Sequence, residues 1–375
     1  MCGLISENKI IRLLLDRYGA KSPLVKKGIG DDAAVIRSRH GGEYLLVTTD
    51  MLLEGIDFRR EWTTPRRLGC KSIAVNLSDL AAMGARPLFF TVSLAVPAGI
   101  SERWILDLYD GLTEPGSSGN AQLIGGDLSH TDGGIAISIT ALGESIKRKV
   151  LYRNGGRAGD LLYVTGTLGR SAAGLRLLQN GCIRPRSRAQ KEAIRMHQSP
   201  EARCEAGMWL AQCGLVHCMM DLSDGLSMDL PRMCAASGVG AEIQVADLPV
   251  FPESQRWGCD PVKMALHGGE DFELLFSVPR SKSRIFAEKY PPHFPRITRI
   301  GTMIRDAGKI WILEPGKDRC LLVEHGYDHF SRRAGHGGFS VVECLLTDDC
   351  LKSDLLNGLA VENQRAVDHR RPIKP

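Results

Sequence analysis

The sequence predicts a mixed α/β protein with two domains. Segments with the alternation typical of strands and segments with the apolar spacing of helices follow one another in both halves of the chain. The chain has 375 residues, and a typical domain length of roughly 100–200 residues makes two domains the expected number. The hydrophobic share of 43% and the charged share of 24% are those of a globular protein rather than a disordered one.

Composition excludes several classes of function. The 48 lysines and arginines against 43 aspartates and glutamates leave a net charge of +5, which is too small for a nucleic-acid-binding surface. No apolar run reaches the ~18 residues of a membrane span, and Glu7 and Lys9 come too early for a signal peptide. The 11 cysteines are scattered without a C-x-x-C pair, as in proteins of reducing compartments. We therefore expect a cytoplasmic protein without nucleic-acid or membrane partners.

The first elements follow from apolar spacing. A helix is predicted over 6–18 because Ile10, Leu14 and Tyr18 fall on one face. A Gly-rich turn comes next, and then the segment 43–50, an apolar run that ends in polar residues. That pattern is typical of a buried strand whose last residues reach a site.

A second helix is predicted from its capping residues. Thr64 is a suitable N-cap and Pro65 suits the first helical turn. The helix runs to Met83, and its spacing places Asn76 and Asp79 on one face. The other elements expected in the first half are strands over 88–96, 121–125 and 135–143 and a helix over 101–113.

The second half repeats the alternation of strands and helices. Strands are expected over 161–164, 240–245, 272–278 and 297–303, and helices over 170–180, 201–213 and 225–236. We expect domains over 1–146 and 147–335, joined through the basic stretch 147–157. Residues 336–375 form a tail to which we assign no order, apart from a short helix that Ser353 is suited to cap.

Acidic residues recur at one kind of position. An apolar run repeatedly ends in small residues followed by one or two acids, in Gly30-Asp31-Asp32, Thr48-Thr49-Asp50, Leu77-Ser78-Asp79, Gly125-Gly126-Asp127, Asp221-Leu222-Ser223-Asp224 and Gly268-Gly269-Glu270-Asp271. Each acid alone is explained as a cap or turn residue. Six such segments in one chain favour a shared cleft, where glycine lets backbone and carboxylate approach one ligand.

A cleft with several carboxylates requires cations. Two like charges 4 Å apart repel by about 4 kcal/mol at an effective dielectric constant of 20. The ligands offered are oxygens of Asp, Thr and Ser, which select Mg²⁺ over zinc or copper, and Mg²⁺ held in this way usually shares phosphate oxygens of a substrate. The Walker, protein-kinase, G-x-G-x-x-G and G-x-S-x-G patterns are all missing from the sequence. The chemistry expected is therefore phosphoryl or nucleotidyl transfer with several divalent ions.

With these residues in view, the chain resembles the thiamine-monophosphate kinases, within the superfamily of aminoimidazole ribonucleotide synthetase and selenophosphate synthetase. The resemblance rests on segments that occur in the family's order over about residues 3–331. They are Gly28-Ile29-Gly30-Asp31-Asp32-Ala33-Ala34, Thr49-Asp50, Ala74-Val75-Asn76-Leu77-Ser78-Asp79-Leu80-Ala81-Ala82-Met83-Gly84-Ala85, Leu123-Ile124-Gly125-Gly126-Asp127, Asp221-Leu222-Ser223-Asp224-Gly225-Leu226, Gly268-Gly269-Glu270-Asp271 and Gly326-Tyr327-Asp328-His329-Phe330.

The resemblance implies an activity and a role for each matched residue. The activity is ATP-dependent phosphorylation of thiamine monophosphate to thiamine diphosphate, with ATP as co-substrate and several Mg²⁺ ions. The implied metal ligands are Asp32, Thr48, Thr49, Asp50, Asp79, Asp127, Asp221 and Asp224. The implied ATP contacts are Tyr109, Gly126, Asp127, Arg153 and Ser223, and the implied substrate contacts are Asp57, Glu270 and Tyr327. It also implies a homodimer whose N-terminal sheets pair into a barrel, with the nucleotide along that interface.

The implied reaction needs no general base. The acceptor is a phosphate monoester with a second pKa of about 6, so it is mostly a dianion at neutral pH. His267 is accordingly interpreted as a structural residue. The cluster of Cys213, His217 and Cys218 matches no common zinc spacing and is interpreted as packing.

Some residues depart from the family pattern and leave alternatives open. Asp57 stands where the family often has His, Ser129 and His130 replace the usual threonines, and the tail 336–375 lies outside the pattern. One alternative is another ATP-using enzyme of the superfamily, and a second is a dimeric binding or regulatory protein that keeps the sites without turnover. For Arg153 the alternative to an ATP contact is a solvated charge in a basic linker.

Overall fold

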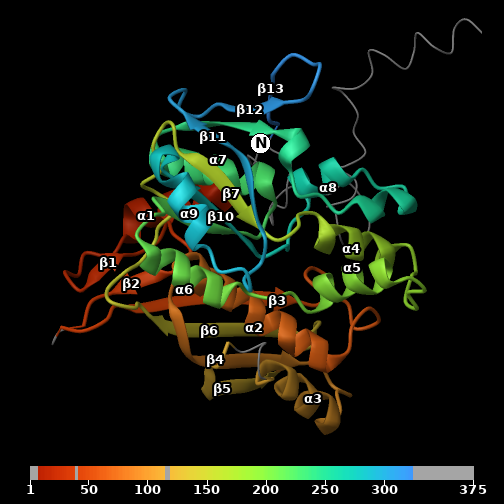
Figure 1. The fold of residues 1–375 in the computed structure, drawn as a ribbon. Helices are drawn as coiled ribbons and strands as arrows, with labels where there is room; N and C mark the ends of the chain where they lie inside the picture. The colour runs from red at the N-terminus through yellow and green to blue at the C-terminus, as the bar shows by residue number, and fades with distance from the viewer. Residues whose placement is uncertain (1–6, 39–40, 115–118, 324–375) are drawn as a thin grey trace, which may run out of the picture.

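Two β-sheets, both largely antiparallel, form the framework of the protein (Figure 1). The computed structural model describes residues 7–38, 41–114 and 119–323. In Figure 1 the first sheet lies at the bottom of the view, the second lies above it, and helix α2 runs between them. Each sheet keeps one parallel pair, β4 with β5 and β12 with β9. The mixed α/β class expected from the sequence is therefore confirmed for each half.

In the part of the chain that the structure describes, the first sheet has six strands in the order β1-β2-β3-β6-β4-β5. Their bounds are β1 Val25–Lys27, β2 Ala34–Ile36, β3 Leu45–Leu53, β4 Arg86–Val96, β5 Gln122–His130 and β6 Ala136–Glu144. The four strands that the sequence predicts are all present, and β5 continues further than its prediction, as far as His130. Strand β5 is an edge strand whose side chains are mostly exposed.

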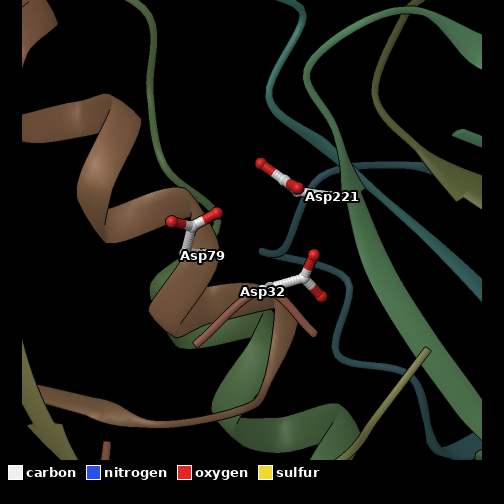
Figure 2. A group of neighbouring side chains, drawn as sticks. All are labelled: Asp32, Asp79 and Asp221. Carbon is white, nitrogen blue, oxygen red and sulfur yellow. The ribbon is translucent and has the colours of Figure 1, made fainter. Parts of the chain in front are cut away.

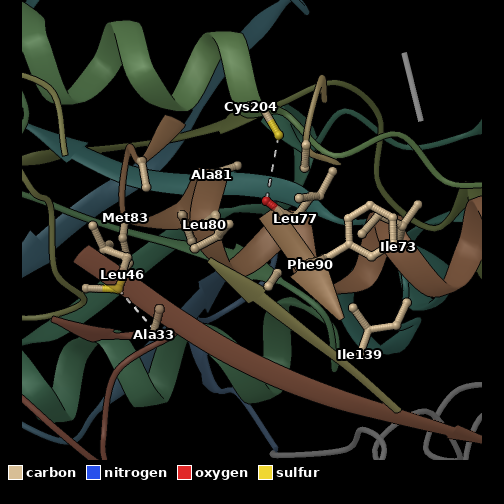
Figure 3. Packing of buried hydrophobic residues seen from close by; sticks show 14 of the residues in the cluster. Ala33, Leu46, Ile73, Leu77, Leu80, Ala81, Met83, Phe90, Ile139 and Cys204 are labelled. Carbon is tan, nitrogen blue, oxygen red and sulfur yellow. Dashed lines mark hydrogen bonds between the residues drawn. The ribbon is translucent and has the colours of Figure 1, made fainter. Parts of the chain in front are cut away.

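Helix α2 (Pro65–Ala82) forms the centre of the molecule. Its start is as predicted, because the Thr64 side chain accepts a hydrogen bond from the Arg67 N–H and Pro65 occupies the first turn. Most of its side chains are buried, in a core that continues from the first sheet into the second half of the chain. Figure 3 shows part of this core, where Ile73, Leu77 and Leu80 of α2 pack beside Phe90 of β4.

Within the described residues the second sheet has seven strands, in the order β13-β12-β9-β11-β7-β10-β8. Their bounds are β7 Leu161–Thr165, β8 Cys218–Leu222, β9 Gly240–Gln244, β10 Glu273–Val278, β11 Ile297–Ile304, β12 Ile310–Leu313 and β13 Cys320–Leu321. The helices of this half are α4 Arg170–Gln179, α5 Arg188–Gln198, α6 Cys204–Cys213, α7 Leu226–Ser237, α8 Pro261–His267 and α9 Ser283–Lys289. The four strands predicted in this half are present as β7, β9, β10 and β11. The three predicted helices are present as α4, α6 and α7.

Several elements of the second half were not predicted. Helix α5 begins with a capping box, in which the Ser187 side chain and the Gln190 side chain each accept a hydrogen bond from the other residue's backbone N–H. Helix α8 begins where Asp260 caps the N–H groups of Val262 and Lys263. Both signals are visible in the sequence, whereas β12, β13 and α9 are too short to show a periodicity.

The two terminal regions differ from the expectation in different ways. Helix α1 (Glu7–Tyr18) is present, but Leu14 and Tyr18 of its predicted apolar face are exposed, at 42% and 62%. Helix α3 (Glu102–Leu112) matches its prediction.

The segment 336–375, with the helix expected at Ser353, lies outside the described residues, as does Tyr327. Among the described residues, no helix has the length and apolar character needed to cross a membrane.

Candidate active site

A cavity of about 550 Å³ opens beside α2, between the two halves of the chain. Most of the residues proposed from the sequence line it, although they come from segments far apart in the chain. They are Asp32, Thr48, Thr49, Asp50, Asp57, Asp79, Arg153, Asp221, Ser223, Asp224 and Glu270. Acids from five of the six segments therefore converge on one cavity, whereas Asp127 of the sixth segment does not line it.

Three aspartates form the centre of the site (Figure 2). Asp32 precedes β2, Asp79 lies in the last turns of α2, and Asp221 lies in β8. One carboxylate oxygen from each lies within 4.8 Å of the others. This arrangement brings ligands from both halves of the chain to one point.

The electrostatics of the three aspartates disfavour three negative charges together. Burial raises the pKa of Asp32 to about 6, with Arg153 opposing the shift and Asp31 adding to it. Burial and the charge of Asp32 raise the pKa of Asp221 to about 7, against the lowering effect of its bond from Ser78. The pKa of Asp79 is raised well above its ordinary value by burial and then by Asp50. A cation at this point would remove the repulsion.

Hydrogen bonds from hydroxyl groups orient the carboxylates. Thr48 Oγ1 donates to Asp79 Oδ2 at 2.5 Å, and Ser78 Oγ donates to Asp221 Oδ2 at 2.5 Å. Asp32 Oδ2 is buried and accepts no hydrogen bond from the described residues. An unsatisfied carboxylate oxygen beside two other aspartates, with only oxygen ligands nearby, fits a hard divalent cation such as Mg²⁺.

Strand β3 presents its polar residues to both faces of the sheet. Thr48 and Asp50 are two residues apart and share the face toward α2, where the Asp50 N–H donates to Asn76 Oδ1 at 3.0 Å. Thr49 also borders the cavity, but its hydroxyl donates to the Ile139 main-chain oxygen at 3.0 Å. Asn76, which the sequence placed on the Asp79 face of the helix, is therefore a support for the strand.

Arg153 is a cavity residue rather than a solvated charge. Its guanidinium bonds to the Asp32 carboxylate, and its backbone N–H donates to Asp31 Oδ1 at 3.2 Å. Lys27 pairs with the same Asp31 at 3.2 Å. The basic stretch 147–157 is thus attached to the acidic turn, and Arg153 stands beside the three aspartates.

A second arginine, which the sequence did not single out, lies at the Asp224 side of the cavity. Arg232 of α7 contacts Asp224 Oδ2 at 2.5 Å and Asp229 Oδ1 at 2.9 Å. Asp229 is fully buried, and burial followed by the charge of Asp224 raises its pKa well above the ordinary value. The sequence signal for this ion pair is the three-residue spacing of Asp229 and Arg232, which places both on one face of a helix.

Glu270 lies at another part of the cavity, between two basic side chains. Lys71 Nζ is 2.7 Å from Glu270 Oε1, and His197 Nδ1 is 3.0 Å from Glu270 Oε2. Burial acts to raise the pKa of Glu270, but Lys71 and His197 outweigh it and lower the pKa to about 2. Neither Lys71 nor His197 was predicted. Lys71 is the only charged residue between Arg67 and Asp79, a pattern that indicates a buried cation with a partner.

Asp57 borders the cavity, but its side chain accepts a hydrogen bond from the backbone of the turn in which it lies. Its Oδ2 accepts a hydrogen bond from the Leu53 N–H at 2.7 Å, and its main-chain oxygen accepts one from Lys71 Nζ at 3.2 Å. His267 Nδ1 lies 2.9 Å from Ser227 Oγ, consistent with the structural interpretation. His217 contacts Asp160 at 2.7 Å, and in the described part of the chain only the three aspartates have the spacing of a group that could hold a metal ion.

Of the predicted residues that the structure describes, three lie outside the lining of this cavity. Tyr109 is on α3, and Gly126 and Asp127 are on the edge strand β5. The sheet order places β6 and β4 between β3 and β5, so β5 lies roughly 14 Å from β3 at ~4.8 Å per strand. Gly126 also has a packing reason to be glycine, because a Cβ there would lie 2.0 Å from the Val92 main-chain oxygen.

Comparisons with known proteins agree with this architecture. Family models for the N-terminal and C-terminal domains of AIR synthase related proteins match residues 30–145 and 157–311. The thiamine-monophosphate kinase of Bacillus subtilis (strain 168) is 34% identical over 308 residues, which are 82% of this chain and 94% of that protein. That of Rhodopirellula baltica is 37% identical over 299 residues, 77% of this chain and 86% of that protein.

The chain belongs to the thiamine-monophosphate kinase family. It is therefore an enzyme of the kinase class. A solved structure described as AaThiL complexed with AMPPCP and TMP has a TM-score of 0.74 and 32% identity, and the match covers 87% of this chain and 97% of that one. The two-domain fold expected from the resemblance is thus confirmed, whereas the single chain contains no closed barrel within its described residues.

Proposed function

We propose that this enzyme transfers the terminal phosphoryl group of ATP to thiamine monophosphate and forms thiamine diphosphate. The group of Asp32, Asp79 and Asp221 carries this proposal, because a site with three converging carboxylates suits metal-assisted phosphoryl transfer. The related structure that holds AMPPCP and TMP together supports the choice of both substrates. The same reaction is the one that the names of the relatives state.

The metal ligands proposed are those that line the cavity together. Asp32, Asp79 and Asp221 would hold Mg²⁺, with Asp50, Thr48 and Thr49 on β3 and Asp224 after β8 as further ligands. When bound, Mg²⁺ supplies charge neutralisation at the phosphoryl oxygens and alignment of the attacking and leaving oxygens. The protein's own contribution is orientation, through the hydroxyl groups of Thr48 and Ser78.

The acceptor oxygen needs no base from the protein. The phosphate of thiamine monophosphate has a second pKa of about 6 and is mostly dianionic at pH 7. Neither His197, which contacts Glu270, nor His267, which contacts Ser227, lies in the aspartate group. Arg153 and the Ser223 segment would bind the phosphates of ATP, and Glu270 would bind the thiamine part, with Tyr327 as a further substrate contact.

Asp127, Gly126 and Tyr109 require a second copy of the chain in this proposal. The β5 edge and the neighbouring sheet face expose large apolar side chains, at 36% or more, including Met51, Phe89, Ile124 and Leu128. A symmetric homodimer would cover this face and bring the partner's β5 toward the cavity, with the two N-terminal sheets forming the expected barrel. The described cysteines are free, which supports the proposed cytoplasmic location.

The test is direct. The protein is incubated with ATP, Mg²⁺ and thiamine monophosphate, ADP release is followed, and the products are identified by mass spectrometry. We expect ADP and thiamine diphosphate in equal amounts. ADP release only with a different acceptor would indicate another enzyme of the superfamily. Binding of both substrates without ADP would indicate a binding or regulatory protein.

A further inference from the structure

Lys71 occupies an unusual place for a lysine. It lies in the buried part of α2, and its side chain is only 3% exposed. Removing an ammonium group from water is costly unless partners replace the water. Its partners among the described residues are Glu270 Oε1 at 2.7 Å and the main-chain oxygen of Asp57 at 3.2 Å, and both residues line the cavity. The ammonium group of Lys71 therefore contacts residues of the cavity wall, although its side chain is buried.

His197 completes the arrangement from the other side. The residue is 5% exposed and lies in the last turn of α5, and its Nδ1 lies 3.0 Å from Glu270 Oε2 and 3.3 Å from Ser171 Oγ. Glu270 itself retains 29% side-chain exposure, toward the cavity that it lines. Each oxygen of a carboxylate has about two acceptor positions. With one position on each oxygen occupied, Glu270 keeps acceptor capacity for a group in the cavity.

The backbone of Glu270 is also fixed. Its φ is +65°, a left-handed conformation that is costly for a residue other than glycine. The Glu270 N–H donates to the Ser223 main-chain oxygen at 2.7 Å, and a Cβ at Gly269 would lie 2.6 Å from that same oxygen. The loop is thus held close to the end of β8 while Lys71 and His197 hold the side chain.

We propose that Lys71 and His197 are positioning residues that fix Glu270 as an ionised hydrogen-bond acceptor for an amino group on a ring of the substrate, and so select substrates that carry this amino group. The inference rests on the proposed function, because thiamine monophosphate carries a ring amino group at the end opposite its phosphate. A carboxylate held between two N–H donors can accept from an amine but cannot donate to a carbonyl oxygen.

The spacing along α2 agrees with this assignment. Lys71, Val75 and Asp79 are four residues apart and share one face of the helix, and Val75 and Asp79 both line the cavity. Eight residues of helix span about 12 Å. A phosphate at the Asp79 end and a ring amine at the Glu270 end would therefore lie two helical turns apart. Ala172 and Leu175 of α4 line the same cavity and offer apolar contacts to a ring.

The experiment compares two acceptors and several variants. The acceptors are thiamine monophosphate and oxythiamine monophosphate, in which an oxo group replaces the amino group. We expect the wild type to prefer the first by at least ~100-fold in kcat/KM, because an unpaired carboxylate facing an oxo group is strongly unfavourable. Lys71→Met should reduce that preference at least ~10-fold, mainly through KM for thiamine monophosphate, with the KM for ATP unchanged.

His197→Leu gives a second, independent measurement and should reduce the same preference at least ~3-fold, because Nδ1 no longer restrains Oε2. The matched control is Arg203→Met. Arg203 pairs with the buried Glu273 at 2.5 Å, and neither residue lines the cavity. This control should lower the melting temperature and leave the preference unchanged.

Each outcome decides the inference separately from the proposed function. A wild type that forms thiamine diphosphate but uses both acceptors equally well would overturn the inference and leave the proposed function standing. Variants that fold and keep the full preference would overturn it too. If Lys71→Met does not fold, His197→Leu alone decides, since its preference either falls or stays. A wild type that phosphorylates neither acceptor contradicts the proposed function itself.

Discussion

Ser78 Oγ donates a hydrogen bond of 2.5 Å to Asp221 Oδ2 and so joins α2 to β8 at the centre of the site. Ser78 is completely buried and Asp221 is 3% exposed. The two residues are 143 positions apart in the chain, one from each half. The group of three aspartates therefore forms only when both halves of the chain are packed on α2, which couples folding of the whole molecule to the assembly of the site.

The first prediction concerns stability and pH without divalent ions. Burial raises the pKa of Asp221 from its ordinary value of 3.8 to about 7, so between pH 4 and 7 the folded state binds more protons than the unfolded state. Stability contributed by this residue is accordingly lost as the pH rises through that window. In EDTA, the melting temperature of Asp221→Asn minus that of the wild type should increase by several degrees as the pH rises from about 4.5 to 7.5.

Magnesium provides the check on that prediction. Added Mg²⁺ should raise the melting temperature of the wild type at pH 7.5, because a ligand that binds only the folded state stabilises it. It should have much less effect on Asp221→Asn. A wild type whose melting temperature, relative to the variant, does not fall with pH would show that Asp221 is not held in a repulsive group.

The second prediction concerns Asp50 and Asp127. Asp50→Asn and Asp127→Asn should each lower kcat/KM at least ~100-fold, as expected for residues that organise charge at a reacting phosphate, while both variants remain folded. Near-normal turnover of either variant at saturating Mg²⁺ would remove that residue from the site. Since β5 lies far from β3 in the sheet order, the proposed dimer supplies Asp127 from the partner.

Mixing these two variants tests the dimer. After the subunits are exchanged at equal amounts, half of the dimers are mixed, and each mixed dimer contains one site with both aspartates intact. Activity should therefore return to about a quarter of the wild-type value for a symmetric dimer with shared sites. If Asp50 and Asp127 belonged to the same site within one chain, every site would be defective and no activity would return.

The convergence of the acids on one cavity was easier to predict from the sequence than the details of the fold, for a physical reason. Acids that follow small residues at the ends of apolar runs are local signals, and those at Asp32, Asp50, Asp79, Asp221, Asp224 and Glu270 line one cavity. Arg153 and Asp57, which also line it, were named only from the family resemblance. Lys71 and His197 were not predicted as site residues, because their role depends on contact with Glu270, which is remote from both in the chain. The exposure of Leu14 on α1 was equally beyond the sequence, since periodicity predicts an apolar face but not what covers it.

The third prediction concerns the acceptor. Free thiamine should not be phosphorylated, because its neutral hydroxyl group brings no charge to the metal site and requires a base. No histidine lies in the group of Asp32, Asp79 and Asp221, which is the group of the described residues whose spacing could hold a metal ion. Mass spectrometry after incubation with ATP and Mg²⁺ should show thiamine unchanged, with thiamine monophosphate as the positive control. Formation of thiamine monophosphate from thiamine would contradict direct attack by a phosphate dianion.

The fourth prediction concerns the C-terminal segment. The match to the related ligand-bound structure covers 97% of that chain but 87% of this one, and the family models end at residue 311. Truncation after Arg333 keeps Tyr327 and should leave turnover and ATP affinity within about threefold, or ~0.65 kcal/mol. The competing hypothesis is an amphipathic helix over 353–367 that docks on the second half of the chain, against which Gly358 counts. Docking would make the truncated protein melt several degrees lower than the full chain, because an apolar patch would become exposed. Thermal melts and turnover of both proteins, measured side by side, distinguish a dispensable segment from a docked one.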